Sequence, residues 1–384
     1  MSERKKELEI YIHIPFCVKK CKYCDFLSGP GDEDTKAQYI EALCCEIQEK
    51  SNRYRQYEVT SIFFGGGTPT AVEAKMLCRV LAVVKERFDV KTDAEITIEM
   101  NPGTVKKEAL ILYKKAGVNR VSLGLQSIHN EELQRLGRIH TYEQFLETYE
   151  QVRAVGFENV NIDLMSALPG QDMESYKKSL ERVTQLIPPP EHISAYSLII
   201  EEGTPFYEKY EQGKLDLPVE EVEREMYHLT KVYLKEQGYE RYEISNYAKP
   251  DRECVHNIGY WQRKNYVGFG IGAASLIENE RFSNGEDLQE YLENPCDCEI
   301  NHQCLSVEEQ MEEYMFLGLR MCQGVSIKGF YQSFGSTLNQ VYGQVMEKHI
   351  KNGLLEQKEG WIRLTEAGMD VSNYVMADFL EPDI

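Results

Sequence analysis

The sequence predicts an α/β fold: a partial, TIM-like barrel of six β/α units, followed by a small, mostly helical C-terminal domain. Strand and helix patterns alternate over roughly the first 240 of the 384 residues, as the periodicity of apolar residues indicates. Units of this kind imply a parallel sheet with right-handed crossovers. Six units are too few to close an eight-stranded barrel. After residue 240 the periodicity changes, which indicates a different architecture.

Each expected strand is followed by polar or glycine-containing residues. The strands are expected at residues 8–16, 59–64, 94–100, 120–125, 159–165 and 192–200. Helical patterns separate them, for example up to residue 87, at 106–116 and at 175–186. Reactive groups in such folds lie at the C-terminal ends of the strands. We therefore expect the cysteines after the first strand, the glycines after the second, Glu99, Gln126 and Asp163 to face one mouth.

The last third of the chain is expected to be mostly helical. A strand at 241–247 precedes an aromatic- and glycine-rich stretch at 254–275 that lacks clear periodicity. Helices are expected at 307–321, 327–334 and 338–352, then a hairpin at 353–364 that turns near Glu359, and a final helix from Thr365. This order resembles a small winged-helix module. The expected domains are residues 1–240, a connecting region at 241–305, and 306–384.

Composition excludes several classes of function. The net charge of −20 disfavours general nucleic-acid binding and adhesion to anionic lipid, since both need Lys and Arg. No apolar run approaches the ~20 residues of a membrane span, and the first residues, Met1–Lys6, show no export signal. Eleven cysteines without such a signal indicate a reducing cytoplasm, where thiols are free for metal.

Cys17, Cys21 and Cys24 form a CxxxCxxC motif directly after the first strand. Three thiolates in one loop can hold three irons of a [4Fe–4S] cluster and leave the fourth iron open, whereas clusters that only move electrons take four cysteines. A zinc site usually needs a second ligand pair further along the chain. From the spacing alone, a cluster, zinc and chance all stay open.

Gly65-Gly66-Gly67-Thr68-Pro69 follows the second strand. Glycines there let the backbone approach a ligand, and their N–H groups form a polar cradle. A simple packing turn is an equal alternative for this loop taken alone. Its position one unit after the cysteine loop favours an amino-acid group that chelates the open iron.

Together these motifs resemble the radical S-adenosylmethionine (SAM) superfamily. The chain is most similar to the group of oxygen-independent coproporphyrinogen III oxidases. The matching segments, in order, are Tyr11–Cys17, Ile96–Pro102, Gly124–Ser127, Leu136–Arg138, Asn161–Met165 and Leu168–Gly170. The similarity covers roughly the first two-thirds of the chain.

The resemblance implies a role for each matching residue. Cys17, Cys21 and Cys24 would bind the cluster, and Glu99 would hold polar groups of SAM. The residues implied for the rest of the SAM site are Tyr11, Tyr23, Gly66, Gly67, Thr68, Gln126, Arg138 and Asp163. One or two SAM molecules both fit the resemblance. The alternatives are helix caps or ion pairs for the carboxylates, and a surface charge for the arginine.

Two features point from the oxidases to a sister family, the HemW-type haem chaperones. The oxidases carry a further cysteine two residues after the third ligand, where this chain has Phe26. His256-Asn257-Ile258-Gly259-Tyr260-Trp261 matches the HNxxYW signature of the chaperones. Histidine is a common axial ligand of haem iron, and Tyr260 and Trp261 offer flat faces to a porphyrin. An aromatic packing motif against the barrel is the alternative, and Cys254 could be a ligand or a buried thiol.

The remaining cysteines are expected to be structural. Cys296, Cys298, His302 and Cys304 do not follow a standard zinc spacing, so a solvent-accessible loop with reduced thiols is expected. Cys44 and Cys45 lie on a helical pattern and are expected in the core.

The leading expectation is a haem chaperone with a radical SAM core, which takes haem as cargo and delivers it to a haem-requiring, respiratory protein. Transient association with a membrane would accompany delivery. The enzyme alternative is a coproporphyrinogen III dehydrogenase, or another radical SAM enzyme that acts on a tetrapyrrole. A third alternative is an iron–sulfur or nucleic-acid regulator, which the acidic charge disfavours. A flavodoxin or ferredoxin would suit as electron donor.

Overall fold

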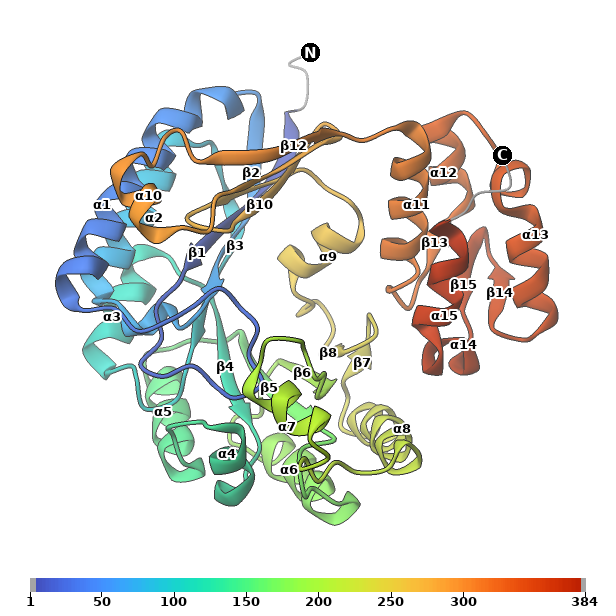
Figure 1. The fold of residues 1–384 in the computed structure, drawn as a ribbon, viewed down its shortest axis with the longest axis horizontal. Helices are drawn as coiled ribbons and strands as arrows, with labels where there is room; N and C mark the ends of the chain where they lie inside the picture. Colours follow the sequence, from blue (N-terminus) through green and yellow to red (C-terminus); the bar gives the residue numbers. More distant parts are fainter. Residues whose placement is uncertain (1–4, 381–384) are drawn as a thin grey trace.

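The computed structural model describes residues 5–380. Within them, one curved sheet of twelve strands forms the core domain, in the order β12-β11-β10-β9-β1-β2-β3-β4-β5-β6-β8-β7 (Figure 1). Neighbours from β1 to β6 pair in parallel, which confirms the expected partial barrel of six units. The six strands are β1 Lys6–Ile14, β2 Tyr57–Gly66, β3 Val90–Met100, β4 Arg120–Gln126, β5 Val160–Ser166 and β6 His192–Ser197.

Helices cover the outer face of this sheet (Figure 1). They are α1 Glu33–Lys50, α2 Ala74–Arg87, α3 Lys107–Ala116, α4 Asn130–Leu136, α5 Tyr142–Ala154, α6 Met173–Thr184 and α8 Glu220–Glu236. The short helix α7 Pro205–Glu211 lies instead at the mouth, in front of β5 and β6 (Figure 1). Side-chain caps start several of them; Thr141 and Asp172 each form a capping box, which satisfies amide groups of the first turn. Ile10, Ile12 and Ile14 are fully buried in the main apolar core, as their alternation in β1 predicts.

The connecting region extends the core sheet at both of its edges. Its elements are β7 Glu240–Arg241, β8 Asn246–Ala248, α9 Val255–Trp261, β9 Tyr266–Phe269, β10 Ala274–Ile277, β11 Glu280–Asn284, α10 Leu288–Glu293 and β12 Glu299–Cys304. The single strand expected at 241–247 is wrong, because residues 242–245 separate two short antiparallel strands, β7 and β8. β8 pairs with β6, and β9 pairs with β1. The helix α9 therefore crosses the opening between the two edges of the six-stranded sheet (Figure 1).

The C-terminal domain has its own apolar core, which includes Met315, Phe330, Tyr342 and Ile362. Its elements are α11 Val307–Gly318, β13 Val325–Ser326, α12 Ile327–Phe334, α13 Leu338–Lys351, β14 Leu355–Lys358, β15 Trp361–Leu364, α14 Glu366–Asp370 and α15 Ser372–Ala377. The three helices and the hairpin confirm the winged-helix-like prediction. The two-residue strand β13 completes a small sheet in the order β13-β15-β14. In the part of the chain that the structure describes, no helix is long and apolar enough to cross a membrane.

Candidate functional site

The cysteine loop after β1 is held from several sides by backbone hydrogen bonds. The Cys17 amide donates to the Gly29 carbonyl at 2.9 Å, and the Lys22 amide donates to Leu136 at the end of α4, also at 2.9 Å. At the other side, the Phe206 amide of α7 donates to the Lys22 carbonyl at 3.0 Å. These contacts fix the loop over the C-terminal ends of the strands. All three thiols are free and partly exposed.

A cavity of about 430 Å³ opens beside this loop. Its volume lies in the usual range of ~300–1,000 Å³ for small-molecule sites. The sequence-predicted residues that line it are Cys17, Cys21, Tyr23, Cys24, Gly66, Gly67, Thr68, Glu99, Gln126, Arg138 and Asp163. The parallel strands thus bring residues more than 140 positions apart to one mouth, as expected from the fold.

Tyr11 lies outside the residues that line the cavity. Its hydroxyl group is 3.0 Å from Nδ1 of His13, and its ring lies beside Phe63. Burial, with a smaller contribution from Glu99, raises the pKa of its phenol. Tyr11 therefore supports the wall beneath the cavity in this structure, and its contact with SAM stays a prediction.

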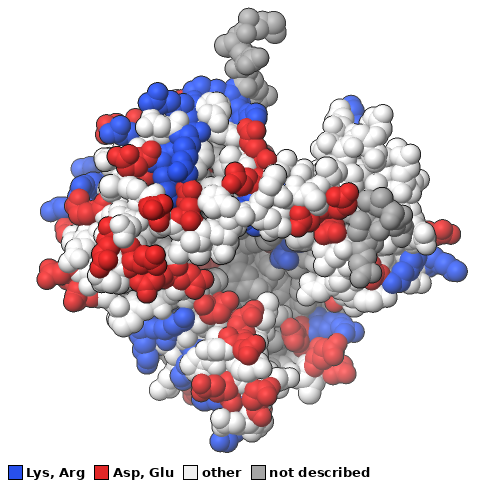
Figure 2. Space-filling model, turned by 45° about the horizontal axis from the view of Figure 1, so that its top comes forward, with Lys and Arg blue, Asp and Glu red and all other residues white. Residues whose placement is uncertain are grey.

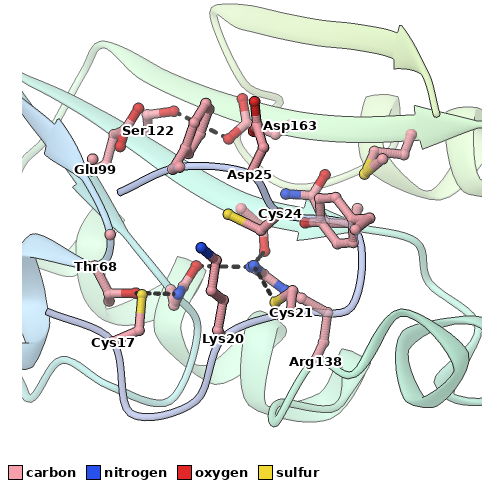
Figure 3. A pocket seen from close by; sticks show the side chains of 18 of the residues that line it. Cys17, Lys20, Cys21, Cys24, Asp25, Thr68, Glu99, Ser122, Arg138 and Asp163 are labelled. Carbon is pink, nitrogen blue, oxygen red and sulfur yellow. Dashed lines mark hydrogen bonds between the residues drawn. The ribbon is translucent and has the colours of Figure 1, made fainter. Parts of the chain in front are cut away.

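A chain of hydrogen bonds connects two of the cysteines across the mouth (Figure 3). Arg138 donates to Asn101 Oδ1 at 2.7 Å, and Asn101 Nδ2 donates to Thr68 Oγ1 at 2.7 Å. Arg138 Nη1 lies 3.7 Å from Cys21 Sγ, and Thr68 Oγ1 lies 3.6 Å from Cys17 Sγ. Donors aimed at sulfur stabilise thiolates and tune clusters that thiolates bind. Arg138 is thus part of the site rather than a surface charge.

The glycine loop approaches the cysteine loop too closely for side chains. A Cβ at Gly67 would lie 2.8 Å from the Phe16 carbonyl oxygen and 3.0 Å from Cys17 Sγ. At Gly66, where φ is +107°, a Cβ would point at the His13 ring rather than into the cavity. The glycines are therefore required by loop-to-loop packing as well as by any ligand.

Glu99 and Asp163 place two carboxyl groups against the cavity (Figure 3). Burial and the nearby Asp163 raise the pKa of Glu99 to about 8, although the Gly66 amide and Arg120 act in the opposite direction. Burial also raises the pKa of Asp163, against hydrogen bonds from Asn161 and other groups. A cation in the cavity would favour the ionised form of both groups.

Gln126 ends β4 in a left-handed conformation, with φ of +70°, which is uncommon for a residue with a side chain. The turn directs its amide to the cavity, and its Oε1 has no hydrogen-bond partner among the described residues. Arg138 Nε also has no hydrogen-bond partner among the described residues. Such buried polar atoms cost stability unless a ligand or water satisfies them.

These observations fit a [4Fe–4S] cluster and SAM. The loop supplies three free thiols with donors beside two of them, and the cavity supplies two carboxyl groups and an unpartnered amide for a cationic, polar ligand. Within the described residues, no three His, Cys, Asp or Glu side chains already converge as a metal site.

Several residues of the site were not predicted from the sequence. Asn101 bridges Arg138 and Thr68, and Tyr196 and Lys20 line the cavity. Only Asn101 gave a signal, because it directly follows the third strand. Phe26 is 59 % exposed and also lines the cavity, so no thiol stands at this point of the mouth.

His256 lies in the interior of the partial barrel, 1 % exposed. Its Nδ1 is 2.8 Å from Ser61 Oγ and its Nε2 is 3.3 Å from the Tyr260 hydroxyl, while its ring stacks on Phe63. Burial, and then Arg120, lower the pKa of the imidazole to about 3. Both ring nitrogens are occupied, so haem ligation by His256 would require α9 to move.

The other residues of the motif differ in their access to solvent. Asn257, Tyr260 and Trp261 are half-buried. Cys254 is fully buried, 3.4 Å from Glu95 Oε1, and burial raises the pKa of its thiol. Trp261 stands at the end of α9 that faces the C-terminal domain, where it lines a second cleft.

Two expectations about the other cysteines are wrong. Cys45 is exposed rather than in the core, because α1 turns that side outward; its Sγ lies 3.5 Å from Cys296 Sγ. Cys298 is buried rather than solvent-accessible, because it packs 3.4 Å from Lys50 Nζ beneath the sheet edge.

Comparisons with known proteins identify the family of the chain. Residues 11–183 match the model of the radical SAM superfamily, and residues 305–371 match the HemN C-terminal domain. The chain is 37 % identical to "Heme chaperone HemW" of Lactococcus lactis, over 99 % of each chain. It is also 37 % identical to the protein of the same name in Bacillus subtilis, over 96 % of this chain and 98 % of that one.

The fold has a counterpart among solved structures. The coproporphyrinogen III oxidase HemN of Escherichia coli superposes with a TM-score of 0.85 at 24 % identity, over 98 % of this chain and 90 % of that chain. At that identity the likeness concerns the fold. The whole-length sequence matches decide the family: this chain belongs to the HemW family of haem chaperones, within the radical SAM superfamily.

Proposed function

We propose that this protein binds haem and delivers it to haem-requiring proteins. The observation that carries the proposal is the whole-length similarity to proteins named haem chaperones, which includes both the core and the C-terminal domain. Phe26 at the cavity mouth supports it, because phenylalanine supplies neither a metal ligand nor a thiol. Conversion of coproporphyrinogen III is therefore not expected.

We propose further that Cys17, Cys21 and Cys24 hold a [4Fe–4S] cluster and that SAM occupies the adjoining cavity. Cluster and SAM together supply reductive cleavage of the SAM sulfonium. The chain's part is to bind, orient and shield these groups. Arg138 and Thr68 donate toward the cysteine sulfurs, and Glu99 holds polar groups of SAM.

A cysteine exchange tests the cluster site directly. The triple Cys→Ala variant at the three positions should lose the iron and sulfide that wild type takes up in anaerobic reconstitution. The matched control is Cys304→Ala, at an exposed thiol far along the chain, which should reconstitute as wild type does. Unchanged iron content in the triple variant would reject the assignment.

The proposed electron donor is a flavodoxin- or ferredoxin-type protein. Lys19 and Lys20 are exposed on the cysteine loop, next to Val18, which is 63 % exposed. A basic patch beside the cluster would steer a donor with an acidic surface, in spite of the net charge of −20. Lys19, Val18 and Ile139 border the same small cavity as Cys21, and both lysines also line the larger cavity beside the cysteine loop, so the patch would lie close to a bound cluster.

The recipient is proposed to be a respiratory haem protein, which would bring the chaperone into transient contact with a membrane. The proposed location is the cytoplasm, since its reducing conditions keep cluster thiols free. Nucleic acid is not expected as a partner. The net charge of −20 supports this last point; on the face shown in Figure 2, both acidic and basic side chains lie around the hollow between the two domains.

One sample tests the function. Anaerobically reconstituted protein is titrated with haem and then assayed with coproporphyrinogen III, SAM and a reductant. We expect stable haem binding, seen as a Soret band, and no protoporphyrinogen IX. Catalytic formation of protoporphyrinogen IX would show that the protein is a coproporphyrinogen III dehydrogenase rather than a chaperone. Absence of haem binding would also reject the proposal.

A further inference from the structure

A second cleft of about 250 Å³ lies at the seam between the core domain and the C-terminal domain. It shares no lining residue with the cavity at the cysteine loop. Both tryptophans of the chain line it: Trp261 from the end of α9 and Trp361 from β15. Arg263, Tyr314, Met321 and Gln323 also line it.

Two residues that line this cleft carry a buried donor without an acceptor. The donors are Trp261 Nε1 and Arg263 Nη2, neither of which finds a partner among the described residues. Arg263 is held in place, because its Nε donates to Glu313 at 2.7 Å and its Nη1 donates to Asn279 at 2.8 Å. Indole and guanidinium nitrogens only donate, so a ligand that satisfies them must bring an acceptor, and a carboxylate suits best.

The rest of the cleft suits a flat apolar ring. The two indoles and Tyr314 offer aromatic surfaces, and Arg320 covers the Trp261 ring at 4.3 Å. Met321 is 9 % exposed and contributes a thioether, a side-chain type that binds haem iron in other proteins. An aromatic plane, two donors for a carboxylate and a soft ligand for iron are together the features of a haem site.

We propose that the cargo haem docks in this cleft, with a propionate on Trp261 and Arg263, its ring against the indoles, and Met321 at the iron. The inference rests on the proposed function as a haem carrier. The cleft is smaller than the ~300–1,000 Å³ of sites that enclose a small molecule. Part of the haem ring therefore stays outside the cleft, where the recipient protein can contact it.

The test is haem titration of the full chain, with affinity and Soret band as readouts. Trp361→Ala removes a ring surface, Trp261→Phe removes the indole N–H together with the five-membered ring but keeps an aromatic ring, and Gln323→Trp fills the cleft from an exposed position. Each should weaken haem binding by about tenfold or more. Met321→Leu should shift the Soret band. The matched control, Gln332→Trp at an exposed site of α12, should bind as wild type does.

The outcomes separate the site from the function. If wild type binds haem and the folded cleft variants bind it equally tightly with an unshifted band, the cleft is the wrong site and the chaperone proposal stands. If wild type itself binds no haem, the proposed function fails. Thermal unfolding of each variant identifies loss of fold; Gln323→Trp and Trp261→Phe keep the test valid if Trp361→Ala does not fold.

Discussion

Replacing Glu99 by glutamine should stabilise the cluster-free protein at alkaline pH and weaken SAM binding. The folded-state pKa of Glu99 is raised from 4.5 to about 8, so the folded protein holds this proton where the unfolded chain has released it. Glu99 therefore lowers the free energy of unfolding as the pH rises above 4.5, and this loss reaches its full size above about pH 8. Below pH 4.5 the carboxyl group is neutral in both the folded and the unfolded state, so Glu99→Gln should be no more stable than wild type.

The full shift corresponds to about 5 kcal/mol, which is an upper limit. Glu99 is only half-buried and faces the cavity, so water screens part of the effect, and we expect about 1–3 kcal/mol. Urea unfolding of wild type and Glu99→Gln at pH 5.5 and 8.5 measures it. Glu131→Gln, at an exposed carboxylate on α4, is the control.

Ligand binding provides the second measurement. A cationic ligand beside Glu99 favours the ionised carboxylate, so SAM binding should release protons and strengthen between pH 6 and 8. Calorimetry in buffers of different ionisation enthalpy detects the released protons. The reasoning is refuted if Glu99→Gln is no more stable relative to wild type at pH 8.5 than at pH 5.5, or binds SAM with the same pH dependence.

Three further predictions follow from the geometry. Gly67→Ala should cost about 1–3 kcal/mol of stability and impair cluster uptake, because its Cβ would press on the Phe16 carbonyl; unchanged urea midpoint and iron content would contradict this. Lys19→Glu with Lys20→Glu should slow cluster reduction by flavodoxin about tenfold at low salt, whereas reduction by dithionite, a small anion, should slow much less; equal slowing of both would argue for a damaged cluster instead. His256→Ala should lower stability by about 2–4 kcal/mol yet leave the Soret band unshifted, and a shifted band would restore the imidazole as the axial ligand.

Periodicity predicted the six parallel strands and the C-terminal helices, because buried faces repeat every two or 3.6 residues. The same rule could not find β7 or β13, which have two residues each. Their pairing depends on partners far along the chain rather than on local pattern. Short strands of this kind are visible only in the folded chain.

The sequence also predicted some residues of the candidate site and missed others. Strand ends located Glu99, Gln126 and Asp163, since parallel strands place such ends at one edge. The bridge through Asn101 depends on side-chain geometry across three loops. The burial of His256 was not predictable either, because the position of α9 depends on the pairing of β8 with β6 and of β9 with β1, at opposite edges of the six-stranded sheet.

The placement of α9 has a thermodynamic consequence. Ser61 of β2 contacts His256 of α9, and five residues further β2 ends at Gly66, which lines the cavity beside the cysteine loop, a distance of about 16 Å along the strand. The other end of α9 carries Trp261. Any coupling that this strand transmits must be reciprocal: the factor by which SAM alters haem affinity equals the factor by which haem alters SAM affinity. If the affinity for haem falls when SAM is consumed, then haem binding must also raise the affinity of the protein for SAM.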